Sequence, residues 1–157
     1  MMNLSIHSEI FNSSFGLFSL TTEGPYIRSL DFIKKDEFLS QKTSSPLIWR
    51  EDFFYEPHLF SLKPKGTEFQ LKIWDLVKTI PLGKTLCYKE IALLYEIKYK
   101  NSSFVRAVAS AIAKNPIAFL IPCHRVIYKS GKYGSYKWGA NKKNKLLKWE
   151  YDRVSQP

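Results

Sequence analysis

Two adjacent side chains, those of Cys123 and His124, have the chemistry of a nucleophile and its base. They follow the apolar run 117–121 and Pro122, so we expect the cysteine to stand where the chain leaves the core. An apolar setting by itself raises the pKa of a thiol and makes it inert. A histidine base that is oriented by a carboxylate reverses this effect. The sequence therefore predicts a reactive Cys123, with His124 as its base and Arg125 as a source of positive charge.

The spacing leaves two features of this pair open. Adjacent side chains of an extended strand point to opposite faces, so either the backbone turns at Cys123 or a water bridges it to His124. The carboxylate that would orient the histidine is also not fixed. The candidates in the second half of the chain are Glu68, Asp75, Glu90, Glu96, Glu150 and Asp152. The alternative interpretation is that the cysteine and the histidine are neighbours by chance.

The positive charge of the chain lies in its second part. The 157 residues carry a formal net charge of +10. Up to Lys63 there are 6 basic and 8 acidic residues, whereas from Pro64 onward there are 18 basic and 6 acidic ones. Such asymmetry favours a polyanionic partner, either nucleic acid or a membrane surface. The alternative is a solvated, lysine-rich surface.

The cysteine content argues against a metal site. Cys87 and Cys123 are the two cysteines, and their separation matches no metal-ligand spacing, so no zinc site can be built from them and we expect no metal. We interpret Cys87 as a small buried hydrophobic residue. The N-terminal stretch has no signal-peptide pattern, and no apolar run approaches membrane-spanning length. We therefore expect a cytoplasmic protein with free thiols.

The pattern of elements indicates an α+β protein of two domains, 1–63 and 64–157. Residues 4–62 form short apolar runs broken by turn signals, which is typical of a small antiparallel sheet. A short helix is expected within 34–45, and a linker within 59–65. From Thr67 the spacing of apolar residues becomes helical.

Three helices are predicted at the start of the second domain. The first begins at Thr67, the second runs from Tyr88 to about Tyr95, and the third spans 103–114 with Ser102 or Ser103 as its cap. The second and third resemble a helix-turn-helix. The third is rich in alanine and carries one arginine, Arg106, so it is slim enough to approach another surface closely. Tight packing against a neighbouring helix is the alternative explanation.

The run from Ile121 to Ile127, Ile-Pro-Cys-His-Arg-Val-Ile, resembles the active-site signature of the O6-alkylguanine-DNA alkyltransferase family. The likeness covers about residues 66–150 and is looser in the N-terminal part. Its further matches are Gly66-Thr67-Glu68-Phe69-Gln70, Ile73-Trp74, Ile80-Pro81, Gly83, Thr85, Tyr88, Arg106-Ala107-Val108, Asn115-Pro116, Tyr136, Trp138-Gly139, Lys143, Leu146-Leu147 and Glu150. The resemblance implies a ribonuclease H-like N-terminal sheet domain and a helical, winged helix-turn-helix-like C-terminal domain.

The resemblance also implies a reaction. Cys123 would attack the O6-alkyl carbon of guanine and keep the alkyl group as a thioether, so each molecule would act once as a methylated-DNA–cysteine S-methyltransferase. His124 would take the thiol proton through a bound water, and Glu150 would fix the imidazole. Tyr136 would hydrogen-bond the guanine and help to protonate it. The partner would be double-stranded DNA that contains O6-alkylguanine, and O4-alkylthymine is a further candidate substrate. The protein would act as a monomer without a cofactor.

The implied mode of DNA binding is base flipping through the minor groove, because a stacked base cannot reach a buried thiol. Arg106 would fill the space that the flipped guanine leaves, and Tyr88 would press on the 3′ phosphate. Small side chains would let the helix enter the groove, namely those of Ala107, Ser110 and Ala111. The base pocket would comprise Ile112, Asn115, Val126 and Ser135, with the carbonyl groups of Cys123 and Val126 recognising the guanine amino group. Asn115 would tie the helix to the active-site segment.

One stretch departs from the common family pattern. Between Tyr88 and Arg106 the chain is about four residues longer, and Lys98 and Lys100 in this insertion are candidate phosphate contacts. Two other functions stay open. A lesion-binding protein without catalysis would commonly have a tryptophan in place of Cys123. A cysteine hydrolase would need a glycine-rich oxyanion loop, which the sequence near Cys123 does not contain.

Overall fold

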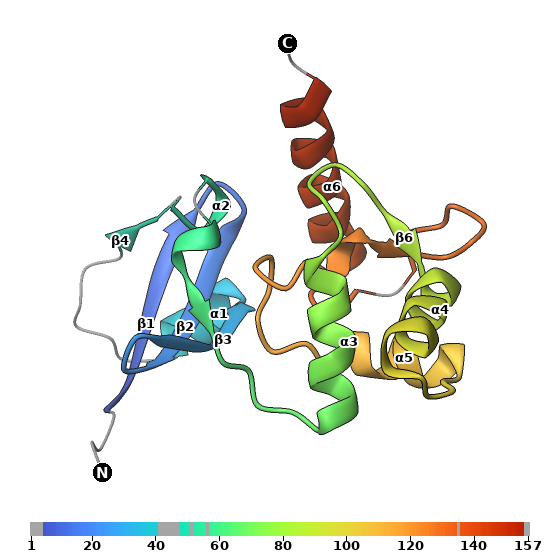
Figure 1. Ribbon diagram of the computed structural model, residues 1–157. Coiled ribbons are helices and arrows are strands. Elements are labelled where there is room, and N and C mark those ends of the chain that lie inside the picture. Colours follow the sequence, from blue (N-terminus) through green and yellow to red (C-terminus); the bar gives the residue numbers. More distant parts are fainter. Residues whose placement is uncertain (1–4, 41–47, 51, 56, 135, 156–157) are drawn as a thin grey trace. The chain divides into compact units, whose positions relative to one another are not determined.

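The computed structural model describes residues 5–40, 48–50, 52–55, 57–134 and 136–155, and the chain divides into two compact units (Figure 1). The first unit comprises Met1–Lys65 and the segment Pro116–Leu120. The second comprises Gly66–Asn115 and Ile121–Pro157. A segment of five residues next to the candidate cysteine therefore belongs to the first unit, whereas the residues on both sides of it belong to the second.

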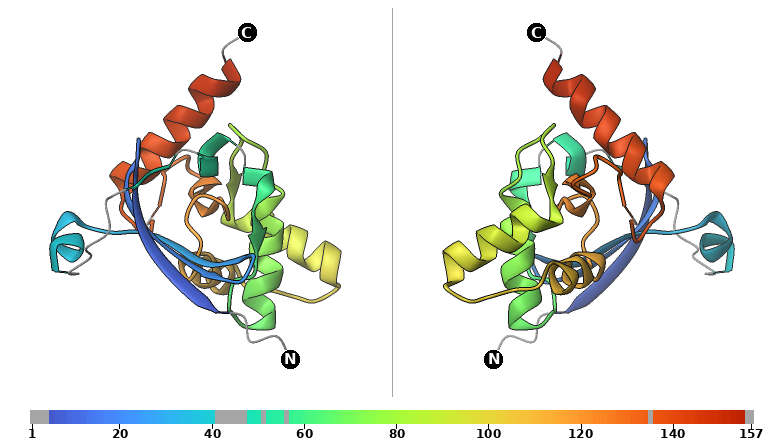
Figure 2. Two further views of the ribbon diagram at one scale, coloured as in Figure 1. Left: turned by 90° about the vertical axis from the view of Figure 1, so that its left-hand side faces the viewer. Right: turned by 90° about the vertical axis from the view of Figure 1, so that its right-hand side faces the viewer.

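The first unit is built on a curved sheet (Figure 2). Its three long strands, β1 (Ile6–Ser13), β2 (Gly16–Glu23) and β3 (Tyr26–Phe32), are antiparallel neighbours, which confirms the expected sheet. Two short edge strands, β4 (Ile48–Trp49) and β5 (Ser61–Leu62), pair parallel to β1 and β3, so the sheet is mixed at its edges. The predicted linker 59–65 is thus partly a strand, because residues 61–62 find hydrogen-bonding partners on β3 that the local sequence does not reveal.

Aromatic side chains fill the core of this unit. Phe11 and Phe18 stack with ring centroids 5.3 Å apart, and Phe18 lies 4.1 Å from Phe32. The alternation of apolar residues along the strands places these rings on one face. The short helix α1 (Lys35–Ser40) lies where the sequence predicts one. The helix α2 (Asp52–Tyr55) contributes Phe54, which is followed by the 3-10 turn η1 (Pro57–Leu59).

The apolar run before Cys123, whose composition suits either a buried strand or an extended segment, does not form a regular strand. It makes one parallel bridge, from Ile117 to Leu30, and then turns, with Phe119 at a φ of 63°. Main-chain hydrogen bonds join Leu30 to Pro116 and Ala118. The run is buried, as its apolar composition requires. It pairs with β3 of the first unit only at Leu30, and the turn at Phe119 ends this pairing.

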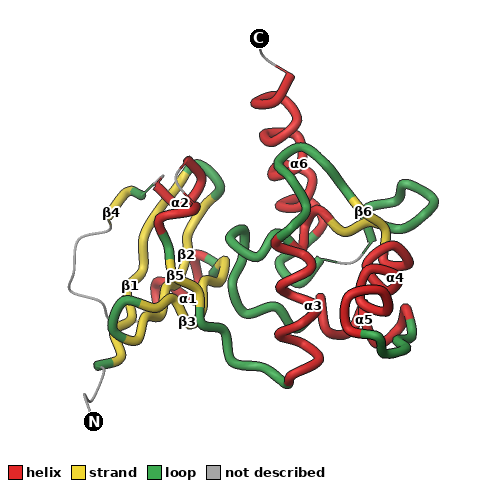
Figure 3. Tube along the Cα trace, in the orientation of Figure 1, coloured by secondary structure: helices red, strands yellow, loops and turns green. Residues whose placement is uncertain are grey.

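The second unit consists mainly of helices (Figure 3). They are α3 (Glu68–Lys78), α4 (Tyr88–Tyr99), α5 (Val105–Ala113) and α6 (Ala140–Ser155). Strands β6 (Leu86–Cys87) and β7 (Val126–Ile127) form a parallel pair, and η2 (Cys123–Arg125) is a 3-10 turn. The whole chain is therefore α+β, with the sheet in the N-terminal unit and the helices in the C-terminal one.

Helix α3 anchors this unit. Thr67 caps it in a reciprocal capping box with Gln70, as the sequence predicts for its start. The indole nitrogen of Trp74 donates to the carbonyl of Ala111 at 2.9 Å, which joins α3 to α5. A side chain at Gly66 would meet the ring of Trp74 at 2.7 Å, so glycine is needed at this close approach. The motif around residues 66–74 is thus explained by the attachment of α3 to its neighbours.

The helix-turn-helix differs from its predicted bounds. Helix α4 continues to Tyr99 instead of about Tyr95, so the added residues before Arg106 form largely one more helical turn. It ends at Lys100 in the left-handed conformation, with φ 53°. Helix α5 begins at Val105, and Phe104 occupies its N-cap, so neither predicted serine caps it. In the described part of the chain, no helix is long and apolar enough to cross a membrane.

Candidate active site

Cys123 opens the turn η2, directly after Pro122. The backbone does turn at this point, which is one of the two arrangements that the sequence left open. The cysteine is 5% exposed and borders a small cavity of about 50 Å³. The other residues that line this cavity are Tyr88, Ala109, Ile112, Ala113, Tyr128, Tyr136 and Lys137. The space suits a water molecule or two, so a base would have to displace some of these side chains to enter.

The surroundings of Cys123 keep its thiol protonated at neutral pH. Burial raises the pKa of Cys123 to about 11. The side-chain amide of Asn115 opposes this shift, because it donates to the sulfur at 3.1 Å, and Lys143 and Lys137 add smaller favourable contributions. A donor of this kind stabilises the thiolate form. The thiol therefore needs a base to lose its proton. Once a thiolate forms, the amide of Asn115 is already in position to stabilise it.

His124 and Glu150 form a fully buried pair, with 2.6 Å between Nε2 and Oε1. Burial lowers the pKa of His124 despite the carboxylate beside it. Burial by itself would raise the pKa of Glu150, but hydrogen bonds from His124 and Arg125 outweigh it and the pKa is lowered. An ionised carboxylate only accepts, so Nε2 carries the hydrogen and Nδ1 has a lone pair for a proton. Of the six candidate carboxylates, the fold places Glu150 on the histidine.

Arg125 holds the same carboxylate from its other side. Its Nε and Nη2 lie 2.9 Å from Oε2 and Oε1 of Glu150, and its Nη1 donates to the carbonyl of Ile80 at 2.6 Å. The charge of Arg125 is thus directed at Glu150, which corrects our expectation that it serves Cys123. The main-chain N–H of Gly83 also donates to Glu150, at 3.3 Å. Glycine is needed there, because its φ is +71° and a side chain would meet Val154 at 2.6 Å.

Asn115 links the end of α5 to the segment that carries the cysteine. Its side-chain amide donates to the carbonyl of Ile121 at 2.8 Å as well as to the sulfur of Cys123, and the residue is fully buried. The contacts are those that the predicted linking role requires. They also explain how one asparagine can orient the nucleophile and the neighbouring helix together.

Three tyrosines line the cavity, and two of them, Tyr136 and Tyr88, are predicted site residues. The hydroxyl group of Tyr136 is buried and makes no hydrogen bond within the described ranges, and burial together with the nearby Cys123 raises its pKa well above the usual value. Tyr88 is 8% exposed and packs against Tyr128, with ring centroids 5.5 Å apart. Burial raises the pKa of Tyr88 too. Tyr88 therefore lies in the wall of the cavity, and little of its surface is available to a DNA phosphate.

Lys143 is a site residue whose environment the sequence did not reveal. It lies on α6 and is fully buried, and its ammonium group donates to the main-chain carbonyls of Val126, at 2.6 Å, and Tyr133. Burial lowers its pKa to about 8, and the nearby Cys123 opposes that shift. Its position on the buried side of α6, in register with Leu146 and Glu150, is the signal that could have indicated it.

The predicted DNA-contacting residues of α5 fall into two groups. Arg106, Ala107 and Ser110 are exposed, whereas Ala111 is buried and its carbonyl accepts from Trp74. The assignment of Ala111 to the DNA surface is therefore wrong, because the face of the helix that it occupies packs against α3. The alanine-rich composition thus allows tight packing on the side of Ala111, while the exposed side stays a candidate contact surface.

The predicted pocket residues also differ in position. Ile112 lines the cavity beside Cys123. Val126 is buried in β7, and its carbonyl already accepts from Lys143. Ser135 lies outside the described residues. The fold thus brings Ile112 and Asn115 to the cysteine and uses Val126 as part of the support behind it.

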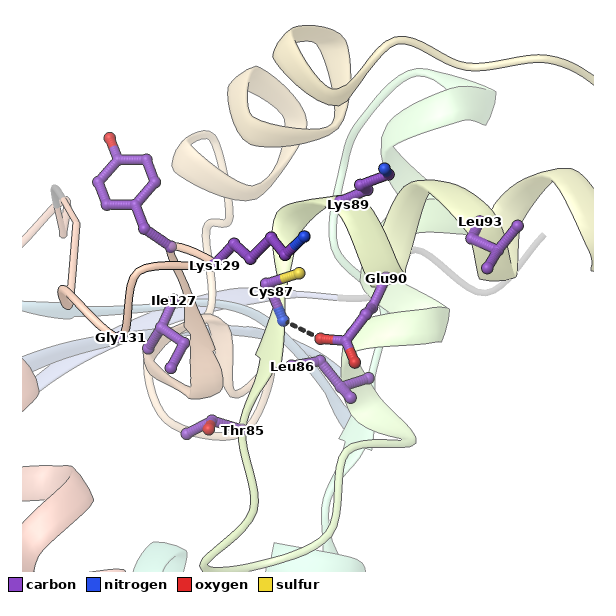
Figure 4. A pocket seen from close by; sticks show the side chains of 10 residues that line it. Thr85, Leu86, Cys87, Lys89, Glu90, Leu93, Ile127, Lys129 and Gly131 are labelled. Atoms are coloured by element: carbon purple, nitrogen blue, oxygen red, sulfur yellow. Dashed lines mark hydrogen bonds between the residues drawn. The ribbon is translucent and has the colours of Figure 1, made fainter.

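A larger cavity of about 490 Å³ lies around Cys87 (Figure 4). Lys89, Lys129 and Leu93 are among its lining residues, and the main-chain N–H of Cys87 donates to Glu90 at 2.6 Å. Cys87 is half-buried, so our expectation of a buried residue is wrong, because it caps the start of α4. Across the residues that the structure describes, no group of three or more His, Cys, Asp or Glu could hold a metal ion.

Comparison with known sequences covers the part of the chain that forms this site. The family described as "6-O-methylguanine DNA methyltransferase, DNA binding domain" matches residues 68–152. A methylated-DNA–protein-cysteine methyltransferase of Methanosarcina acetivorans is 35% identical, over 90% of this chain and 96% of that protein. One of Kluyveromyces lactis is 47% identical over 54% of this chain. The match covers 43%, 40% and 25% of the lengths of the first three curated relatives, so this chain spans less than half of each.

Comparison with solved structures supports the fold of the chain. Mycobacterium tuberculosis OGT in complex with DNA has a TM-score of 0.72 and 29% identity, over 94% of both chains. An O6-methylguanine-DNA methyltransferase from the archaeon Pyrococcus kodakaraensis has a TM-score of 0.63 over 93% of this chain. Because the sequence identity is 21%, this similarity supports only the fold. Both similarities extend over the sheet unit as well as the helical one.

Proposed function

Because the chain belongs to the methylated-DNA–protein-cysteine methyltransferase family, we propose that it repairs O6-alkylguanine in DNA by moving the alkyl group to Cys123. The observation that carries this proposal is the buried arrangement of Cys123, His124 and Glu150 around one turn of backbone. The relatives that share the match are named for this activity. The same family relationship supports O4-alkylthymine as a second candidate substrate.

The sulfur is the attacking group in this proposal. A bond forms between Sγ of Cys123 and the alkyl carbon while the bond from that carbon to O6 of guanine breaks. The thiol proton passes through a water to Nδ1 of His124, and Glu150 stabilises the imidazolium that results. The thioether has no route back to a thiol, so each molecule acts once. The amide of Asn115 stabilises the sulfur as negative charge develops on it.

Tyr136 acts on the leaving base. Its hydroxyl group is buried beside Cys123 with a raised pKa, so it stays protonated and can donate to the guanine as charge develops there. A hydroxyl group without a partner inside a protein costs free energy, and a bound base would supply the acceptor. This makes Tyr136 the polar group of the cavity best suited to orient the substrate.

The DNA contact is made by the exposed face of α5. Arg106, Ala107 and Ser110 lie on it, and the small side chains suit the narrow minor groove. Extrusion of the damaged base would bring it to the Cys123 cavity, with Arg106 in the place that it leaves. We propose that the protein acts on double-stranded DNA as a cytoplasmic monomer without metal or cofactor.

A stoichiometric transfer assay tests the proposal. The protein is mixed with a duplex that contains one O6-methylguanine, and its mass is measured. We expect each molecule to gain one CH2 unit, on the peptide that contains Cys123, and the Cys123→Ala variant to gain none. Cys87→Ala is the matched control and should react like the unmodified protein.

Two results would count against this function. Binding to the damaged duplex without a gain in mass would favour a protein that recognises lesions but does not repair them. Repeated turnover of fresh substrate by one molecule would contradict irreversible transfer to the cysteine.

A further inference from the structure

Phe104, at the start of α5, is the most exposed large hydrophobic side chain of the described residues, at 81%. It occupies the N-cap position with extended backbone angles, φ −94° and ψ 135°. Val105, the next residue, is also exposed, and Arg106 follows it. An apolar tip therefore precedes the arginine at the end of the helix that we propose to contact DNA.

The fold gives no reason for a phenylalanine at this position. N-cap positions favour Ser, Thr, Asp and Asn, whose side chains bond the first N–H groups of a helix, and Phe104 makes no such bond. The preceding serine, Ser103, instead attaches the loop to α4, with its N–H directed to Glu96 at 3.3 Å and its hydroxyl to Ala92 at 3.5 Å. The aromatic ring is neither a cap nor part of the core, and its exposure to water is unfavourable.

The surroundings of Phe104 match DNA in charge. Arg106 is exposed two residues after it, and Lys98 and Lys100, at the end of α4, are exposed a few residues before it. The one carboxylate of the loop region, that of Glu96, accepts from the main chain at Ser103. Apolar side chains at minor-groove contacts insert between base steps, and aromatic rings stack on unpaired bases. An exposed ring two residues before an exposed arginine, in a segment that also carries exposed lysines, suits this use better than contact with an apolar protein surface.

We propose that Phe104 stacks on the base beside the flipped nucleotide and, together with Arg106, keeps the gap in the duplex open. This proposal rests on the function proposed above. Extrusion of a guanine costs free energy because stacking and pairing are lost. Stacking on Phe104 restores part of that loss at the neighbouring base, while Arg106 fills the vacated position. Phe104 is thus a positioning residue, which brings the substrate to Cys123 and takes no part in the chemical step.

The test compares transfer rates on two substrates that differ in the need for flipping. One is a duplex with O6-methylguanine opposite cytosine, and the other is the same modified strand alone. We expect Phe104→Ala to react roughly 10-fold more slowly than the unmodified protein on the duplex and at an equal rate on the single strand. Phe104→Trp should keep the duplex rate, because it preserves an aromatic face.

The control is Ile97→Ala, which removes another exposed apolar side chain, 57% exposed, from α4. It should leave both rates unchanged. An unchanged duplex rate in Phe104→Ala would overturn the proposal, and so would an equal loss in Ile97→Ala, which would point to a general apolar surface. An equal loss on duplex and single strand would assign Phe104 to the reaction site or to folding. Absence of transfer by the unmodified protein on both substrates would contradict the proposed function itself.

Discussion

The polar groups of the Cys123 site and those of the α5 surface are arranged in opposite ways. Around Cys123, each of His124, Arg125 and Glu150 binds another member of the group or the main chain. At the exposed start of α5, by contrast, the side chains of Arg106 and Phe104 are exposed to solvent. The first region is assembled before any substrate is present. The second has exposed side chains that make no contribution to the core, and we propose that DNA contacts them.

This difference separates chemistry from recognition. Buried polar networks hold catalytic groups in one geometry, and the loss of one member leaves the others unsatisfied. A recognition surface must accept a large partner, so its side chains stay exposed until binding. Substitutions in the Cys123 site should therefore lower the transfer rate on duplex and single-stranded DNA alike. Substitutions on the α5 surface should have a smaller effect, which appears only on the duplex.

The largest effect is expected from Glu150→Gln. This change removes the negative charge between His124 and Arg125 while it keeps the size of the side chain. The rate of transfer should fall roughly 100-fold or more on both duplex and single-stranded substrates, because the base loses its orientation. The free energy of unfolding should fall by about 3 kcal/mol, because the buried His124 and the partly buried Arg125 lose their charged partner. Mass-based transfer kinetics and urea unfolding measure the two effects.

Asp152→Asn provides the control for that change. It removes a carboxylate on the same helix that makes an exposed ion pair with Lys148. Its effect on stability should stay within about 0.5 kcal/mol. Comparable losses in the two variants would contradict a special role for the buried carboxylate.

A smaller and more selective effect is expected from Arg106→Ala. The duplex rate should fall about 10-fold, since extrusion of the base is no longer offset by the arginine, whereas the single-stranded rate should stay the same. Lys114→Ala, at the other end of α5, is the matched loss of an exposed charge and should affect binding mainly through its salt dependence. A defect of Arg106→Ala that is equally large on single strands would show that the arginine does not act in flipping.

The smallest effect, a change of a few-fold, is expected from pH between about 6 and 9. Below its pKa, His124 is protonated and cannot accept the thiol proton, and burial lowers this pKa from its ordinary value of 6.5, so the rate should fall only at acidic pH. Above about 8, Lys143 loses the charge that lowers the pKa of Cys123, so the rate should decline again. Single-turnover rates across this range give the profile. A steady tenfold rise per pH unit would instead indicate attack by a thiolate formed beforehand.

Sequence patterns predicted the elements best where the signal was local. Thr67 and Gln70 marked the start of α3, and Asn115-Pro116 marked the end of α5. The start of α5 was misplaced because two serines are good caps, but Ser103 bonds to α4 instead. The composition of the run 117–121 fits either a buried strand or an extended segment, and it forms no regular strand because only one bridge, between Ile117 and Leu30, pairs it with a neighbour.

The sequence by itself identified the candidate nucleophile, its histidine neighbour and the family, because these depend on residue types at fixed short spacings. Spacing alone left six carboxylates for His124, and only the family resemblance selected Glu150. From the sequence we also directed the charge of Arg125 to Cys123 and did not recognise that Lys143 is buried. The tertiary structure decided these points, because α6 brings Glu150 and Lys143 to a turn that precedes them by many residues. It also decided which side of α5 is exposed, since Trp74 of α3 holds Ala111 and leaves Phe104 and Arg106 in solvent. Contacts between distant segments depend on packing, which no local pattern encodes.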